Sequence, residues 1–136
     1  MKKWLIATGA TGSVLLALDF TWLGLATPRL YRPALGPLLA AQADLGAAAL
    51  FYALYLAGLL VLVVGPALAA RSGRLAAFRG AVLGAVAYGT YDLTNLATLR
   101  GWPVTLTIID LAWGIVLTAA AATAGYGATR MSGAAR

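Results

Sequence analysis

The chain has 136 residues, of which 62% are hydrophobic and only 10% are charged, and its mean hydropathy is +0.86. Soluble domains carry about a quarter charged residues, so this composition excludes a soluble globular protein and indicates an integral membrane protein. The net charge is +6. No basic run is interleaved with aromatic residues, so the charge favours contact with anionic lipid headgroups and excludes a nucleic-acid partner.

The chain contains no cysteine and no histidine. Disulfides, zinc fingers, thiol nucleophiles and histidine-ligated haem are therefore excluded. We expect no cofactor and no metal, with one alternative, a single hard cation held by aspartate carboxylates. Any proton chemistry would depend on aspartate, tyrosine or water.

The first apolar run covers residues 4–25 and follows two lysines. It is longer than the core of a signal peptide, which has roughly 7–15 residues, so it predicts a membrane helix that is retained. Three prolines follow within residues 27–37. Because proline interrupts a regular helix, we expect a loop there, or a segment that lies at the membrane interface.

Three more apolar runs follow, at residues 44–68, 78–96 and 104–124. Each run approaches or exceeds the roughly 20 residues that cross a hydrocarbon core of about 30 Å. A short basic turn separates the second run from the third, and Gly101-Trp102-Pro103 separates the third from the fourth. We predict an all-α integral membrane four-helix bundle formed by residues 1–126, followed by a flexible tail at 127–136.

The basic residues are distributed unevenly between the two sides of this bundle. Seven of the ten lie on the side of both termini and the turn at 69–79, and three lie on the other side: Arg29, Arg32 and Arg100. Cytoplasmic loops carry an excess of Lys and Arg, so both termini are expected in the cytoplasm. The imbalance also argues against a protein that inserts in both orientations.

The first and third runs end alike. Asp19-Phe20-Thr21-Trp22-Leu23 is similar to Asp92-Leu93-Thr94-Asn95-Leu96, and the second and fourth runs both begin with an Asp-Leu pair. This similarity favours two helical hairpins of the same orientation, an arrangement that in transporters places sites at the repeat interface. The alternative is chance, because Leu, Ala and Thr recur easily in apolar helices.

The four aspartates are expected at one depth. The outward-running helices carry theirs late and the inward-running helices carry theirs early, so all four fall in the outer half of the bilayer. At 1.5 Å per residue, Asp19 and Asp110 lie roughly 9 Å inside the ends of their helices. The three outer arginines lie just beyond them. Asp44 stands at a helix start, where a carboxylate favours the helix dipole, and is interpreted as a cap.

One face of the third helix carries Gly80, Gly84, Tyr88, Asp92 and Asn95. Its small-xxx-small motif lets another backbone approach closely, either within the bundle or in a homodimer. Asp92 and Asn95 lie on this face and are therefore expected to point inward. Burying an ionisable or amide side chain there costs free energy unless the side chain meets a partner or a cavity.

The functional interpretation is a polar pocket that opens to the outside, with Arg29 and Arg100 at its rim. The candidate ligand-binding residues are Asp19, Trp22, Tyr88, Tyr91, Asp92, Asn95, Arg100, Asp110 and Trp113. The alternative is that the aspartates pair with Arg, Thr and Asn and fix the two hairpins together. Other aromatic residues are assigned to interfacial belts (Trp4, Tyr31, Trp102 and Tyr126) or to packing (Tyr52 and Tyr55).

The block from Tyr91 to Leu99, together with Asp19-x-x-Trp22 and Asp110-x-x-Trp113-Gly114, resembles a bacterial family of small predicted membrane proteins. This family is classified as a domain of unknown function of the 2177 type, and the resemblance covers essentially the whole chain. It implies a four-helix, multi-pass protein of the bacterial inner membrane, and it assigns no catalytic residue. A looser similarity, in architecture and bundle carboxylates, is to the emopamil-binding and sigma-2 group of sterol isomerases and ligand receptors.

Three functions are compatible with this pattern. The first is a protein that binds or carries a lipid-like or cationic small molecule. The second is a membrane enzyme that uses aspartate acid–base chemistry, such as isomerisation, on a lipid-soluble substrate. The third is a structural or assembly subunit of a membrane complex.

Overall fold

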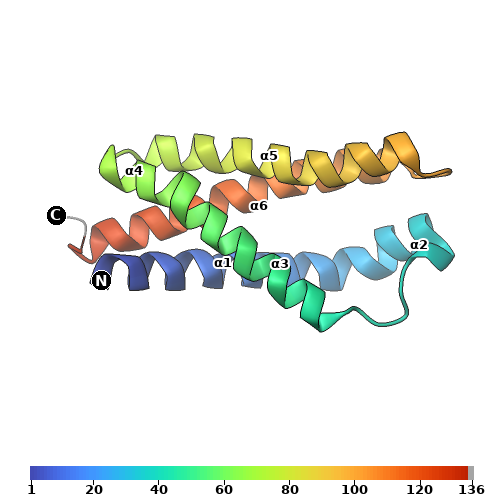
Figure 1. The fold of residues 1–136 in the computed structure, drawn as a ribbon, viewed down its shortest axis with the longest axis horizontal. Helices are drawn as coiled ribbons and strands as arrows, with labels where there is room; N and C mark the ends of the chain where they lie inside the picture. Colours follow the sequence, from blue (N-terminus) through green and yellow to red (C-terminus); the bar gives the residue numbers. More distant parts are fainter. Residues whose placement is uncertain (135–136) are drawn as a thin grey trace.

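The computed structural model describes residues 1–134, which fold into four helical rods joined by short connections (Figure 1). The first rod comprises α1 (Lys2–Ala26), the π-turn η1 (Thr27–Tyr31), α2 (Arg32–Leu35) and the 3-10 turn η2 (Gly36–Leu38). The second comprises α3 (Leu45–Gly58), the π-turn η3 (Leu59–Val64) and α4 (Gly65–Ala69). The third is α5 (Gly73–Thr98) and the fourth is α6 (Val104–Met131). The predicted all-α four-helix bundle is confirmed.

The first rod continues through the region where a loop was expected, so that prediction is wrong for residues 27–35. Pro28 is the second residue of η1 and Pro33 is the second residue of α2. Each proline removes one N–H from the bonding of a continuous rod, and the turn around Pro28 is a π-turn, an irregularity that lets the helix continue past it. The rod bends away only at Gly36, whose φ of +51° is a conformation that favours glycine.

The other helices extend beyond their predicted ends. The third begins at Gly73 rather than at residue 78, and the Ser72 hydroxyl caps it by accepting a hydrogen bond from the Leu75 N–H at 3.1 Å. The fourth continues to Met131, so residues 127–131, which were assigned to the tail, are helical. Residues 135–136 lie outside the described part of the chain, and the flexibility of the tail stays a prediction.

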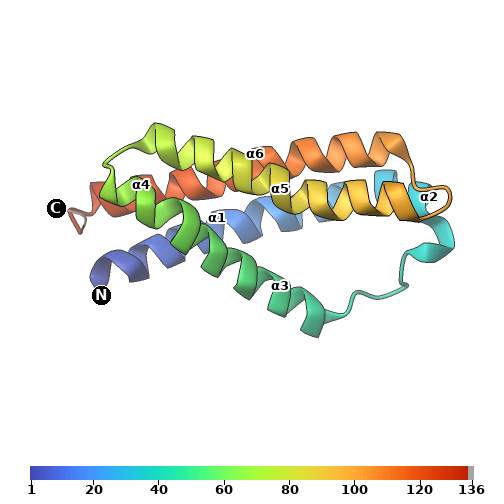
Figure 2. The same ribbon diagram turned by 45° about the horizontal axis from the view of Figure 1, so that its top comes forward.

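The helices α5 and α6 lie antiparallel and side by side, as both ribbon views show (Figures 1 and 2). The glycine face of α5 makes this possible. A Cβ atom at Gly80 would lie 2.9 Å from the Ala119 Cα atom and 2.9 Å from the Thr118 carbonyl oxygen, closer than real Cβ contacts. The face identified in the sequence therefore packs within the bundle, against α6.

The core forms around α6, and α3 diverges from it. Leu15, Leu59, Val63, Leu117 and Ala121 are buried together at the centre. Figure 2 shows the beginning of α3 standing away from the other helices, while its continuation through η3 and α4 rejoins them. A cavity lined by residues of α3 and of the other helices lies at this divergence.

Within the described residues, three helical segments are long and apolar enough to cross a membrane: Lys2–Leu38, Leu45–Ala69 and Val104–Met131. The fourth helix, α5, has 26 residues, which span about 39 Å, but it is less apolar. Its two arginines, its aspartate and its asparagine lower its hydropathy, as do its glycine, tyrosine and threonine residues. That α5 also crosses the membrane stays a prediction, supported by its position along α6.

Candidate functional site

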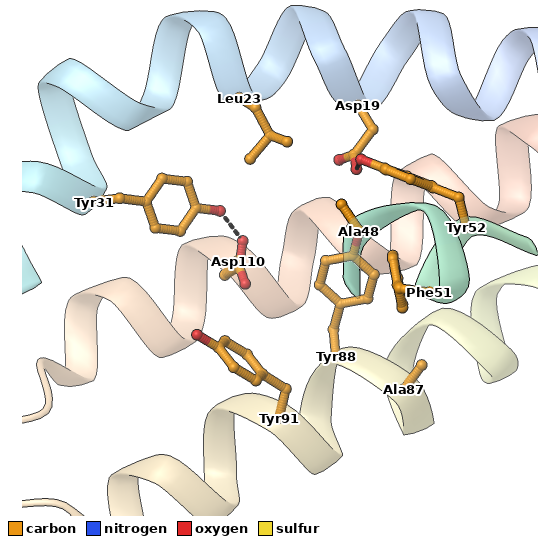
Figure 3. A pocket seen from close by; sticks show the side chains of 10 residues that line it. All are labelled: Asp19, Leu23, Tyr31, Ala48, Phe51, Tyr52, Ala87, Tyr88, Tyr91 and Asp110. Carbon is orange, nitrogen blue, oxygen red and sulfur yellow. Dashed lines mark hydrogen bonds between the residues drawn. The ribbon is translucent and has the colours of Figure 1, made fainter. Parts of the chain in front are cut away.

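A cavity of about 500 Å³ lies where α3 diverges from α1, α5 and α6 (Figure 3). Two carboxylates and four tyrosines contribute the polar part of its wall, and the rest is apolar. The lining residues are Asp19, Leu23, Tyr31, Ala48, Phe51, Tyr52, Ala87, Tyr88, Tyr91 and Asp110.

Asp19 projects from α1 and is held by side chains from two other helices. The Tyr52 hydroxyl donates a hydrogen bond to its Oδ2 atom at 2.6 Å, and the Trp113 indole N–H donates to its Oδ1 atom at 3.2 Å. The residue is only 6% exposed. Both carboxylate oxygens therefore have donors, which offsets the cost of burying the group.

Asp110 projects from α6 and is held from the first rod. The Tyr31 hydroxyl donates a hydrogen bond to its Oδ1 atom, and the Trp22 indole N–H donates to the Tyr31 hydroxyl at 3.0 Å. The Trp22 and Trp113 rings are stacked, with 4.6 Å between their centroids. The two aspartates are thus joined through a layer of aromatic side chains between α1 and α6.

The position of Tyr31 depends on the π-turn η1. A π-turn contains one more residue per turn than an α-helix, so it changes the direction in which following side chains project. Tyr31 is the last residue of η1, and its hydroxyl points at Asp110 (Figure 3). Its assignment to an interfacial belt is therefore wrong, since it faces the interior. Trp102 is also buried, where it donates to the Thr107 hydroxyl at 3.0 Å.

Asp92 projects from α5 and is completely buried, at 0% exposure. Neither of its oxygens has a hydrogen-bond partner among the described residues. Asp110 lies close enough to interact with it electrostatically. Asp92 is thus a carboxyl placed behind the cavity wall, beside a carboxyl that forms part of it.

Four of the nine candidate residues line the cavity: Asp19, Tyr88, Tyr91 and Asp110. The other five do not. Three of these lie behind the wall, namely Asp92 and the stacked pair Trp22 and Trp113. The remaining two, Asn95 and Arg100, belong to the last turns of α5 and the connection after it, where Arg100 is exposed. Ligand binding by any of the nine stays a prediction.

The proposed arginine rim is absent from the cavity wall. Arg29 is exposed, and its guanidinium donates to the Leu25 carbonyl oxygen of its own helix at 3.3 Å. The donors that meet Asp19 and Asp110 are tyrosine and tryptophan side chains rather than arginine. Asp44, in contrast, has its predicted role as a cap, because its Oδ1 atom accepts from the Ala47 N–H at 3.0 Å.

Sequence reasoning missed Tyr31 and Tyr52 as site residues. A depth argument would have found Tyr52, because it follows Asp44 by eight residues and so lies about 12 Å into its helix, close to the depth of Asp19. Tyr31 could not be placed in this way, because the helix was expected to end before it.

These aspartates do not form a metal centre in the described part of the chain. No three acidic side chains of residues 1–134 gather in a way that could hold a metal ion. Asp19 engages its own aromatic partners, while Asp92 and Asp110 form a separate pair. The site is built from carboxyl groups, hydroxyl groups and aromatic faces.

Comparison with known families supports the membrane assignment. Residues 4–127 match the family described as "Predicted membrane protein (DUF2177)". The chain belongs to this family. No curated protein and no solved structure is significantly similar to the chain. Membership in DUF2177 therefore establishes a membrane protein, and the function has to be inferred from the site.

Proposed function

We propose that the cavity binds a lipid-like small molecule that carries a positive charge. The observation that supports this most directly is that two buried carboxylates, Asp19 and Asp110, line one cavity together with aromatic side chains. Carboxylates and the faces of aromatic rings both attract cations.

The size and composition of the cavity support the same proposal. Small-molecule sites have volumes of roughly 300–1,000 Å³ and are mostly apolar, with a few convergent polar groups. A volume of about 500 Å³ lies within that range. No arginine or lysine belongs to the wall, so the ligand alone would supply the positive charge.

The position of the cavity favours entry from the lipid. Leu23, Phe51 and Tyr91 belong to the wall and are also 38–53% exposed, so the cavity is open rather than enclosed. These side chains lie where α3 diverges, so an amphipathic molecule could reach the carboxylates between the helices without passing through water. An apolar body with a cationic group would match both parts of this environment.

The proposal includes an orientation in the membrane. Both termini lie at the same end of the bundle (Figure 1), which is also the end with most basic residues. By the positive-inside rule this end faces the cytoplasm of a bacterial inner membrane, and the cavity lies in the outer half of the bilayer.

The experiment measures equilibrium binding of the lipophilic cation tetraphenylphosphonium to the purified protein in detergent. We expect Asp19→Asn and Asp110→Asn each to weaken binding about tenfold or more, because a hydrogen bond or contact to a charged group contributes about 1.5–3 kcal/mol. Asp44→Asn is the matched control, since this aspartate caps α3 at an exposed position.

A second variant tests the cavity without changing charge. Ala48→Trp fills the space between α3 and α5 and should abolish binding. Equal binding by wild type, Asp19→Asn and Asp110→Asn would contradict the proposal. The enzyme alternative would be favoured if the protein converts a lipid-soluble compound and this activity is lost in Asp110→Asn but kept in Asp44→Asn. The assembly-subunit alternative would be favoured if the protein copurifies with a stoichiometric protein partner.

A further inference from the structure

A second concavity lies on the outside of the bundle, between η3 and α5, and has a volume of about 260 Å³. Its wall is apolar except for Arg79. Leu62, Phe78, Val82 and Val86 are all exposed along it. Phe78 and Val86 are eight residues apart on one helix, so the groove extends for about 12 Å along α5.

The Arg79 side chain is fixed at the edge of this groove. Its guanidinium donates a hydrogen bond to the Leu62 carbonyl oxygen at 3.1 Å. Pro66, four residues after Leu62, has no N–H with which to complete the usual helical bond, so the arginine supplies a donor there. A guanidinium carries five N–H donors, and the Arg79 side chain remains exposed, so this bond leaves it able to contact an anion.

The charge around the groove is positive. Arg71 and Arg74 lie in the turn before α5 and in its first turn, and both are exposed. Asp92 is on the same helix but 13 residues further on, about 20 Å away along the axis. The other three aspartates also lie in the half of the bundle that holds the cavity. An anionic group beside Arg79 would therefore meet no carboxylate.

We propose that this groove binds an anionic phospholipid of the surrounding bilayer, with one acyl chain along the apolar wall and the phosphate at the Arg79 guanidinium. The apolar wall is complementary to an acyl chain, and the Arg79 guanidinium at its edge is complementary to the phosphate of the headgroup. Basic side chains at the cytoplasmic surface attract anionic headgroups in this way.

The site is independent of the ligand cavity, because the two concavities share no lining residue. A second copy of the chain is a poorer occupant of the groove. A symmetric contact through this face would bring the two Arg79 guanidinium groups toward each other, and like charges repel.

The experiment titrates the purified full chain with phosphatidylglycerol or phosphatidylcholine of identical acyl chains and counts bound lipids by native mass spectrometry. We expect wild type to retain phosphatidylglycerol in preference. Arg79→Gln should weaken phosphatidylglycerol retention about fivefold and leave phosphatidylcholine unchanged. Arg100→Gln, at the opposite end of α5, is the matched control and should retain the preference.

A groove-filling variant separates the lipid from a simple anion. Val82→Trp occupies the acyl-chain position and should reduce phosphatidylglycerol retention while Arg79 stays in place. It also serves as the test if Arg79→Gln fails to fold. Equal retention of the two lipids by wild type, unchanged retention in both variants, or displacement of the lipid by glycerol phosphate at equal concentration would each overturn the proposal.

Discussion

At the residue scale, the three buried aspartates have different surroundings. Asp19 and Asp110 have tyrosine or tryptophan donors, whereas Asp92 has none among the described residues. Aromatic donors suit this environment, because Tyr and Trp combine a large apolar body with one polar atom. Their rings fill the space between helices while the O–H or N–H meets the carboxylate.

Asp92→Asn is expected to raise the free energy of unfolding by about 1 kcal/mol. A buried polar group without a partner costs roughly 1–3 kcal/mol, and the carboxamide has the same shape but can donate to the neighbouring Asp110. Denaturant unfolding of the purified protein in detergent measures the change. Asp44→Asn should leave stability unchanged, since asparagine caps a helix as well as aspartate does. A clear loss of stability in Asp92→Asn would show that Asp92 has a partner.

Gly84→Ala is expected to lower the free energy of unfolding by about 1–3 kcal/mol, the usual cost of overpacking. A Cβ atom at Gly84 would lie 2.9 Å from the Gly114 carbonyl carbon and 2.9 Å from the Thr118 hydroxyl oxygen, so α5 and α6 would have to separate. Gly9→Ala is the control, because no atom lies within 4 Å of its added Cβ. Alanine at position 9 should be neutral or stabilising. Equal unfolding curves for the two variants would contradict the close contact.

At the element scale, irregular turns inside the rods position the site. The π-turn η1 carries the first rod past Pro28 and presents Tyr31 to Asp110. The π-turn η3 lies where the second rod rejoins the bundle, and its Leu62 carbonyl receives the Arg79 side chain. Such π-turns occur often at functional sites, because they redirect side chains without ending the helix.

The start of α5 depends on its cap. Ser72→Ala removes the hydroxyl that accepts from the Leu75 N–H and is expected to lower the free energy of unfolding by about 1 kcal/mol. Ser72→Asn should restore it, because asparagine caps equally well. Thermal unfolding followed by circular dichroism compares the three proteins. If Ser72→Asn is as unstable as Ser72→Ala, capping is not the cause.

At the scale of the whole molecule, the distribution of charge and the packing of the helices both bear on the predicted topology. The basic excess lies at the end of the bundle that carries both termini, and the buried aspartates lie in the opposite halves of their helices. The less apolar helix, α5, is sheltered by its glycine contact with α6. The long antiparallel contact with α6 therefore supports the prediction that α5 crosses the membrane as well.

The absence of cysteine allows a direct test of this topology. Ala70→Cys lies in the exposed turn before α5, and Gln42→Cys lies in the exposed connection before α3. In intact cells a membrane-impermeant maleimide should label Gln42→Cys and not Ala70→Cys, and after lysis it should label both. If only Ala70→Cys is labelled in intact cells, the orientation is the opposite of the predicted one. If both positions are labelled in intact cells, the protein does not have a single topology.

The amino-acid sequence by itself determined the membrane class, the number of helices and the faces they bury. The apolar composition and the length of the apolar runs indicate membrane helices, because the thickness and polarity of the bilayer set the length and composition that such helices need. The glycine steps of α5 and the Asp44 cap were also predictable, because each depends on contacts within a few residues or on helical spacing.

Only the tertiary structure decided which side chains meet. The path of the chain past Pro28 depends on a single extra residue in one turn, and this places Tyr31 rather than an arginine against Asp110. The divergence of α3, which opens the cavity, results from packing among four helices and has no local signature. Which buried polar groups become partners depends on the distances between helices. The spacing of residues along one helix does not determine these distances.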